Sequence, residues 1–402
     1  MLAGFASVAA TLTTRCNLSC SYCPQRRGEP SRMSGETLEE AARLVADSGY
    51  PRPRLTLTGG EPLLEPRLVA GAASALRRAA RQGRTASLSL STNGTALDPG
   101  TAHDLATVGA EVMVSLDGVL AAQSLRSGDV TPALERTLRR IAEAEPEWFA
   151  RSVGVRITLH SGNVRFLGDS VLFLSALGFR RIEVSPLVTR DVGWDVRSGR
   201  ELDRRLEGLA TTALPAEPRE GPPLFRPFAP PSRRTAGRGP MCGLGSPESL
   251  FLDVDGSVAP CGAMIPSLLD DPPPLVREAV DTLAGVQVPD PALRERMRAR
   301  AARAVRLAFA RDLEQKCSPR GPCASCEALP ECFVCPASIA FAPEQDPNLV
   351  PTIQCDWNRL VAKHRRAFLA RLASREADLQ RAGSSSSAAE TSAVTPARID
   401  GA

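Results

Sequence analysis

Three cysteines lie within eight residues near the start of the chain, at Cys16, Cys20 and Cys23. Thiolates at such short spacing are typical of metal sites, because one loop then carries several ligands. A zinc site takes four protein ligands, or three and a water, whereas an electron-transfer iron–sulfur cube takes four thiolates. The loop therefore predicts either half of a split metal site or a complete four-iron site with one open iron. The alternative is that these cysteines are small buried hydrophobic residues.

A second set of cysteines lies between residues 242 and 355. Its members are Cys242, Cys261, Cys317, Cys323, Cys326, Cys332, Cys335 and Cys355. Paired C-x2-C spacings, taken alone, are typical of zinc sites. In the cytoplasmic compartment that we expect for this chain, metal ligation is favoured over disulfide formation.

Residues 5–190 alternate strand-like runs with amphipathic helical stretches. Repeated β-then-α order predicts a parallel sheet covered by helices, and about six such units fit, so we expect an α/β partial barrel. Catalytic residues of such barrels lie on the loops that follow the strands. Those loops here carry the cysteines, then Thr58-Gly59-Gly60-Glu61-Pro62, Ser91-Thr92-Asn93-Gly94 and Ser115-Leu116-Asp117-Gly118. Each of the last three alone reads equally well as a plain turn.

Composition and charge limit the possible partners and the domain organisation of the chain. The chain has 402 residues, 43% of them apolar, and a formal net charge of +4 that is too small and too diffuse to favour a nucleic-acid partner. No apolar run has the ~18 residues that a membrane span needs. We expect a barrel over residues 1–210, a Pro- and Arg-rich linker or loop over 211–240, a cysteine-rich domain over 241–365, and a helix end with a disordered tail over 366–402, the low-complexity part being 382–402.

The motifs in residues 5–190 resemble those of radical S-adenosylmethionine (SAM) enzymes. Cys16-x3-Cys20-x-Tyr22-Cys23 matches the cluster motif of that superfamily, including the aromatic residue, and Gly59-Gly60-Glu61-Pro62 matches its second-strand motif. The resemblance implies a [4Fe-4S] cluster on the three cysteines, with SAM bound to the open iron. It also implies that the bound pair generates a 5′-deoxyadenosyl radical that removes a hydrogen atom from the substrate. The SAM contacts that it implies are Tyr22, Gly59, Gly60, Glu61, Ser91, Asn93, Ser115, Asp117 and Arg126.

The second cysteine set resembles the SPASM domain, a small α+β domain with two auxiliary [4Fe-4S] clusters. The resemblance implies that Cys242, Cys261 and Cys335 hold the first auxiliary cluster. Cys323, Cys326, Cys332 and Cys355 would hold the second. Cys317 is the thiol left over, and it either completes the first cluster or leaves there an open iron that a substrate group could occupy.

Enzymes with this pair of domains mostly act on peptides or proteins, so the resemblance implies a ribosomal-peptide maturase that forms a cross-link or a similar modification. Sulfatase-type oxidation of Cys or Ser ranks lower, because Gly262 follows Cys261 where that branch places Asp. A small-molecule dehydrogenase or decarboxylase and a non-enzymatic metal-binding module stay open. The expected partners are the peptide or protein substrate, a separate leader-recognition protein, and an electron donor such as ferredoxin or flavodoxin. No catalytic acid or base is identified, although His160 ends a predicted strand and could face the site.

Overall fold

One sheet of eight strands organises the chain, in the order β6-β5-β4-β3-β2-β1-β7-β8. The computed structural model describes residues 4–25, 29–127, 130–189, 191–212, 223–231, 244, 248–288, 290, 292–293, 295–296, 299, 307–310 and 312–390. The first six strands are β1 (Ser7–Thr11), β2 (Arg54–Thr58), β3 (Ser87–Thr92), β4 (Glu111–Ser115), β5 (Val153–Leu159) and β6 (Ile182–Pro186). Each pairs in parallel with the next, which confirms the predicted α/β architecture of six β-then-α units.

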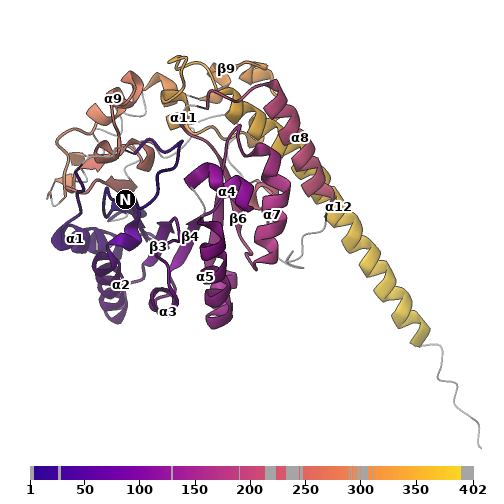
Figure 1. Ribbon diagram of the computed structural model, residues 1–402, viewed down its shortest axis with the longest axis horizontal. Helices are drawn as coiled ribbons and strands as arrows, with labels where there is room; N and C mark the ends of the chain where they lie inside the picture. The colour runs from indigo at the N-terminus through magenta and orange to yellow at the C-terminus, as the bar shows by residue number, and fades with distance from the viewer. Residues whose placement is uncertain are drawn as a thin grey trace, which may run out of the picture.

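Helices connect these strands and cover the outside of the sheet (Figure 1). They are α1 (Gly35–Ala46), α2 (Pro66–Arg81), α3 (Pro99–Thr107), α4 (Leu120–Ser127), α5 (Thr131–Ala144), α6 (Pro146–Ser152), α7 (Leu167–Ala176) and α8 (Val196–Thr211). Local sequence sets several of their starts, because Ser34 and Asp98 cap the first turns of α1 and α3 by accepting backbone N–H bonds. α5 begins at Thr131 with Pro132 in its first turn, where the missing N–H of proline costs no helical hydrogen bond.

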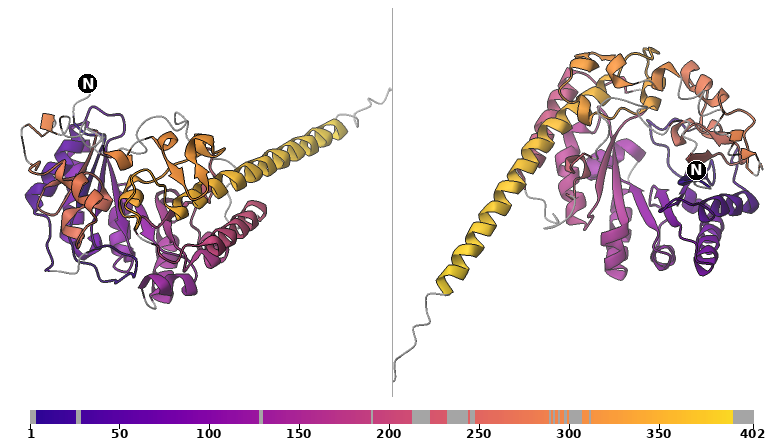
Figure 2. Two further views of the ribbon diagram at one scale, coloured as in Figure 1. Left: turned by 90° about the horizontal axis from the view of Figure 1, so that it is seen from above. Right: turned by 180° about the vertical axis from the view of Figure 1, so that it is seen from behind.

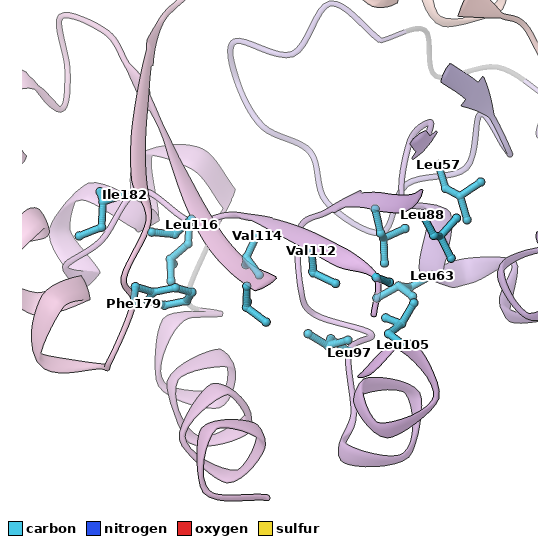
Figure 3. Close-up of a cluster of buried hydrophobic side chains, with 14 of the residues drawn as sticks. Leu57, Leu63, Leu88, Leu97, Leu105, Val112, Val114, Leu116, Phe179 and Ile182 are labelled. Carbon is cyan, nitrogen blue, oxygen red and sulfur yellow. The ribbon is translucent and has the colours of Figure 1, made fainter. Parts of the chain in front are cut away.

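Buried aliphatic side chains join the sheet to these helices. Figure 3 shows Leu57, Leu88, Val112 and Val114 from the strands in one cluster with Leu63, Leu97 and Leu105. Leu57, Val112 and Val114 are fully buried. Because each strand is anchored on its helix face, the loops at its carboxyl end are held in fixed places, and these loops carry the candidate site.

The cysteine-rich region extends the same sheet. Its strand β7 (Ser249–Leu252) pairs in parallel with β1, and β8 (Val258–Ala259) pairs antiparallel with β7. Among the described residues this region also contains the helices α9 (Pro274–Asp281) and α11 (Pro336–Ala340), the two-residue strands β9 (Cys317–Ser318) and β10 (Gly321–Pro322), and several single 3-10 turns. Figure 1 shows these elements above the end of the barrel that lies opposite α3 and α5.

The last helix, α12 (Thr352–Glu390), packs along α8 and then projects beyond the body of the molecule (Figure 2). The helix includes residues 382–390, the first part of the segment that the sequence predicts to be low in complexity and disordered. Its Ala, Arg and Leu content favours a helix, and no proline interrupts it. In the segment 211–240, Phe228 lies 5.2 Å from the Phe368 ring of α12, so the described residues 223–231 are packed against the body.

None of the helices in the described ranges is long and apolar enough to cross a membrane.

Candidate active site

The carboxyl-terminal ends of the six strands β1 to β6, with most of the loops that follow them, surround one cavity of about 350 Å³. Every parallel strand ends on the same edge of the sheet, so residues far apart in the sequence meet there. Ala263 and Phe341 of the cysteine-rich region complete the wall. Predicted site residues that line the cavity are Cys16, Cys20, Tyr22, Cys23, Gly59, Gly60, Ser91, Asn93, Ser115 and Arg126. Glu61 and Asp117 are not among the described residues that line it.

The glycine turn after β2 packs directly against the base of the cysteine loop. The Gly60 N–H donates to the Thr13 carbonyl at 2.8 Å, and the Glu61 N–H donates to the Arg15 carbonyl at 2.7 Å. A Cβ on Gly60 would lie 2.1 Å from the Arg15 oxygen, and Gly59 adopts a φ of 144°. Only glycine permits both this approach and this φ. The turn therefore fixes where the cysteine loop leaves the sheet.

Glu61 holds two loops together from below the cavity. Its side chain is fully buried, and Oε1 accepts hydrogen bonds from the Thr92 hydroxyl at 2.7 Å and the Leu63 N–H at 3.0 Å. Oε2 accepts a bond from the Asn93 N–H at 2.6 Å. Burial raises the pKa of Glu61, and these three hydrogen bonds oppose the rise. The carboxylate thus joins the β2 turn to the β3 turn.

Asn93 places its amide beside the first cysteine. Its Nδ2 donates to Asn17 Oδ1 at 2.9 Å and lies 4.0 Å from the Cys16 Sγ. The N–H and the hydroxyl of Thr95 both donate to Asn93 Oδ1, the N–H at 2.9 Å. The same hydroxyl accepts a bond from Asn17 Nδ2 at 2.8 Å. Asn17 and Thr95 were not predicted as site residues, and these bonds tie the cysteine loop to the β3 turn.

Asp117 and Arg126 form a buried ion pair behind the cavity wall. Arg126 Nη2 and Nε donate to the two carboxylate oxygens at 2.9 and 3.2 Å, and the two side chains are 7% and 0% exposed. The Thr158 N–H and the Tyr22 hydroxyl also donate to Asp117, at 2.9 and 3.3 Å. Burial alone would lower the pKa of Arg126, but Asp117 and Tyr22 raise it above its ordinary value.

Sequence reasoning missed the residue that fixes Asp117. Gln123 is fully buried on α4, and its Oε1 accepts a bond from the Asp117 N–H at 2.8 Å. The resemblance implies that Arg126 contacts SAM. In the structure its guanidinium donates to Asp117, and the residue still lines the cavity. Asp117 therefore holds Arg126 and Tyr22 in place.

Tyr22 connects the cysteine loop to the far strands. Its ring lies 5.5 Å from the Arg126 guanidinium carbon and 5.2 Å from the His160 ring. His160 is 9% exposed, its Nδ1 accepts from the Gly162 N–H at 3.1 Å, and its Nε2 has no hydrogen-bond partner within the described ranges. Burial lowers the pKa of His160 and raises that of Tyr22, so both rings are held neutral near pH 7.

Four cysteines of the second set line a separate cavity of about 380 Å³. They are Cys323, Cys326, Cys332 and Cys355. Burial first, and then the neighbouring thiols, raise the pKa of Cys323 to about 11 and that of Cys332 to about 12. These are the four thiols that the sequence assigns to the second auxiliary cluster.

Cys317 lies beside this same group. It begins β9, which pairs with β10 just before Cys323, and the Cys323 N–H donates to the Lys316 carbonyl at 3.0 Å. The Ser318 hydroxyl that follows it accepts from the Cys355 thiol at 3.3 Å. The described contacts thus associate Cys317 with the second thiol group, whereas the resemblance left it either as a ligand of the first cluster or as a spare thiol.

Of the three thiols that the resemblance assigns to the first auxiliary cluster, the structure describes Cys261 and Cys335, which both pack against one hydrophobic cluster. Cys261 precedes a short turn at 262–264, Cys335 precedes α11, and Cys242 lies outside the described residues. Within the described ranges, no three His, Cys, Asp or Glu side chains converge closely enough to hold a single metal ion. Cys16, Cys20 and Cys23 fit a cluster because these exposed and half-buried thiols line one cavity. The four cysteines of the second cavity also line one cavity, three of them half-buried and Cys355 buried.

Known proteins match the part of the chain that carries the cysteine and glycine motifs. Residues 11–144 match the family model of the Radical SAM superfamily. Pre-heme d1 synthase of Dinoroseobacter shibae is 30% identical over 220 residues, 53% of this chain and 52% of that protein. GTP 3′,8-cyclase of a Synechococcus species is 35% identical over 205 residues, 47% of this chain and 58% of that protein. The chain thus spans little more than half the length of these two relatives.

Two further matches cover more of the chain. PqqA peptide cyclase of Ruegeria pomeroyi is 28% identical over 299 residues, which are 72% of each chain. The solved structure of native anSMEcpe with bound AdoMet and Cp18Cys peptide superposes with a TM-score of 0.68 at 15% identity, covering 93% of this chain and 99% of that chain. At that identity the superposition shows a shared fold.

Proposed function

We propose that this chain, in which residues 11–144 form a radical SAM domain, is an enzyme that cleaves SAM reductively and removes a hydrogen atom from a peptide or protein substrate. The observation that carries the proposal is the shared cavity of the Cys16 loop, the Gly59-Gly60 turn and Arg126, closed by residues of the cysteine-rich region. When bound there, the iron–sulfur cluster and SAM supply the 5′-deoxyadenosyl radical.

The described side chains would have distinct roles around the bound group. Cys16, Cys20 and Cys23 would hold the cluster from one wall of the cavity. The Gly59-Gly60 turn would present backbone polar atoms at close range, since no Cβ intervenes. Asp117 would hold Arg126 so that the rest of its guanidinium faces the cavity, where Arg suits a carboxylate. Ser91, Asn93 and Ser115 would offer hydrogen bonds to the polar groups of SAM.

A peptide substrate is favoured by the extent of the longer matches. PqqA peptide cyclase matches over 72% of both chains, and the anSMEcpe structure, solved with a peptide, covers 93% of this chain. We propose accordingly that the cysteine-rich region holds auxiliary clusters and takes part in peptide binding. We propose further that the enzyme forms a cross-link or a similar modification in that peptide.

A small-molecule substrate is the second candidate. Pre-heme d1 synthase and GTP 3′,8-cyclase have the higher identities, 30% and 35%. Their matches cover about half of this chain, so they bear mainly on the barrel.

The experiment is anaerobic turnover of the reconstituted chain with SAM, dithionite and a candidate peptide that is deuterated at its side chains. Transfer of deuterium to 5′-deoxyadenosine would support a peptide substrate. Formation of unlabelled 5′-deoxyadenosine with every peptide tried, together with deuterium transfer from a small molecule such as GTP, would replace it with the second candidate. A Cys20→Ala chain is the control, because it removes one proposed cluster ligand.

A further inference from the structure

The cavity formed by the second thiol group has a basic rim on one side. Arg359, Lys363 and Arg366 all line it and are exposed. Their spacing of four and three residues places them on one face of α12. Arg320 also lines the cavity, whereas Glu327 is the single acidic residue among the described residues that do so.

The charges of this rim are only partly neutralised within the chain. Arg320 forms two bonds of 2.9 and 3.0 Å with Asp356, and Lys363 Nζ lies 2.8 Å from Asp203. Arg366 lies 3.8 Å from Glu331, which is a loose pair. No carboxylate in the described part of the chain forms an ion pair with Arg359. Positive charge therefore remains at the outer edge of the cavity, where an acidic partner would be attracted.

The rim lies away from the cavity where the substrate would react. The cavity of the Cys16 loop and the cavity of Cys323 share no lining residue. A macromolecule bound at the rim would therefore leave the first cavity open to substrate. The floor beneath the rim is formed by Cys323, Cys326, Cys332 and Cys355, the thiols assigned to an auxiliary cluster. The surface is thus suited to a redox protein more than to the substrate.

We propose that the rim formed by Arg359, Lys363 and Arg366 is the docking surface for a small acidic one-electron carrier protein. The inference rests on the proposed function, in which each SAM cleavage consumes one electron that the chain itself does not supply. The carrier is oxidised by one electron for each SAM cleaved and then leaves. Charge complementarity of this kind acts mainly on the association rate and makes that rate depend on salt.

The test uses the reconstituted full-length chain and FMN-loaded flavodoxin as the acidic probe. Association and dissociation rates are measured by surface plasmon resonance at about 0.01 M and about 0.15 M ionic strength, where charges are screened over ~30 and ~8 Å. The variant is Arg359→Glu/Arg366→Glu. The matched control is Arg136→Glu/Arg140→Glu, which reverses two exposed arginines on α5, and melting temperatures report folding for both.

We expect the α12 variant to associate about tenfold or more slowly at low salt and to lose most of its salt dependence, while the control stays within about twofold of the unmodified chain. Equal losses in both variants, or none in either, would overturn the proposal. So would tighter binding of a poly-glutamate peptide than of flavodoxin, since the rim would then be an acidic-peptide site.

Dithionite-driven SAM cleavage by the unmodified chain separates this proposal from the proposed function. Cleavage without flavodoxin binding would overturn the docking surface alone. Failure of the reconstituted chain to cleave SAM with dithionite would overturn the function, and the role of the carrier with it.

Discussion

Neutralising Asp117 should destabilise the chain far more than neutralising an exposed carboxylate. In Asp117→Asn the buried Arg126 charge loses its partner, although both side chains keep nearly the same shape. Asp117 accepts four hydrogen bonds, from two Arg126 nitrogens, the Thr158 N–H and the Tyr22 hydroxyl, and an amide cannot accept all of them. Breaking one partner of a buried pair costs about 3–5 kcal/mol, because the remaining charge stays buried and unpaired.

The control variant neutralises a carboxylate in an exposed pair. Glu135 pairs with Arg139 on α5 at 2.8 Å, with side chains 31% and 52% exposed. Exposed pairs of this kind contribute about 0.3–0.5 kcal/mol, so Glu135→Gln should change the free energy of unfolding little. The two variants thus remove the same charge at a buried and at an exposed position.

The assay is urea unfolding of the full-length chain, followed by circular dichroism. We expect Asp117→Asn to lose about 3–5 kcal/mol and the double variant Asp117→Asn/Arg126→Met to lose less, since it removes both charges. A loss for Asp117→Asn within about 1 kcal/mol of that for Glu135→Gln would refute the reasoning. It would mean that water reaches Arg126 and that the pair does not hold the cavity wall.

Three further outcomes follow from the same geometry. Gly60→Ala should lower iron incorporation, because its Cβ would lie 2.1 Å from a backbone oxygen of the cysteine loop. Gly71→Ala in α2 is the control and should leave iron incorporation unchanged, because no atom lies within 4 Å of its Cβ. Iron assays on both chains test this prediction. Burial lowers the pKa of His160, so the folded state disfavours its protonation, and the free energy of unfolding should fall as pH drops through about 6.5 towards that lower pKa. Unfolding of His160→Phe at several pH values should lack this component; an unchanged pH profile would contradict the assignment. Cys332→Ser should lose the iron of one four-iron cluster. Cys317→Ser should keep that cluster, because Cys323, Cys326, Cys332 and Cys355 line the cavity without Cys317. Equal iron losses in the two variants would show that Cys317 is needed for the cluster.

The β-then-α pattern predicted the sheet and the loops well, because strands and helices are local features with strong periodicity. β2 ends at Thr58, so the Gly59-Gly60 turn follows the strand as the sequence predicts. The pairing of β7 with β1 could not be read from the sequence, because the two strands are separated by the whole barrel.

The sequence predicted which residues belong to the candidate site better than it predicted what each side chain does there. Carboxylates after a strand look alike in sequence whether they face a cavity or join two loops, and Glu61 and Asp117 both do the latter. Their partners Thr92 and Gln123 are ordinary polar residues whose importance appears only once the loops meet. Cys317 was equally ambiguous, because spacing alone does not tell which neighbouring thiols a hairpin will approach.

The measurement that tests the central claim most directly is SAM cleavage by the anaerobically reconstituted chain. We predict that dithionite will yield 5′-deoxyadenosine and methionine in equal amounts, and that Cys20→Ala will yield neither. Iron analysis of the same sample should give about twelve irons per chain, from three four-iron clusters. A reconstituted chain that binds iron at Cys16, Cys20 and Cys23 but forms no 5′-deoxyadenosine would contradict the account.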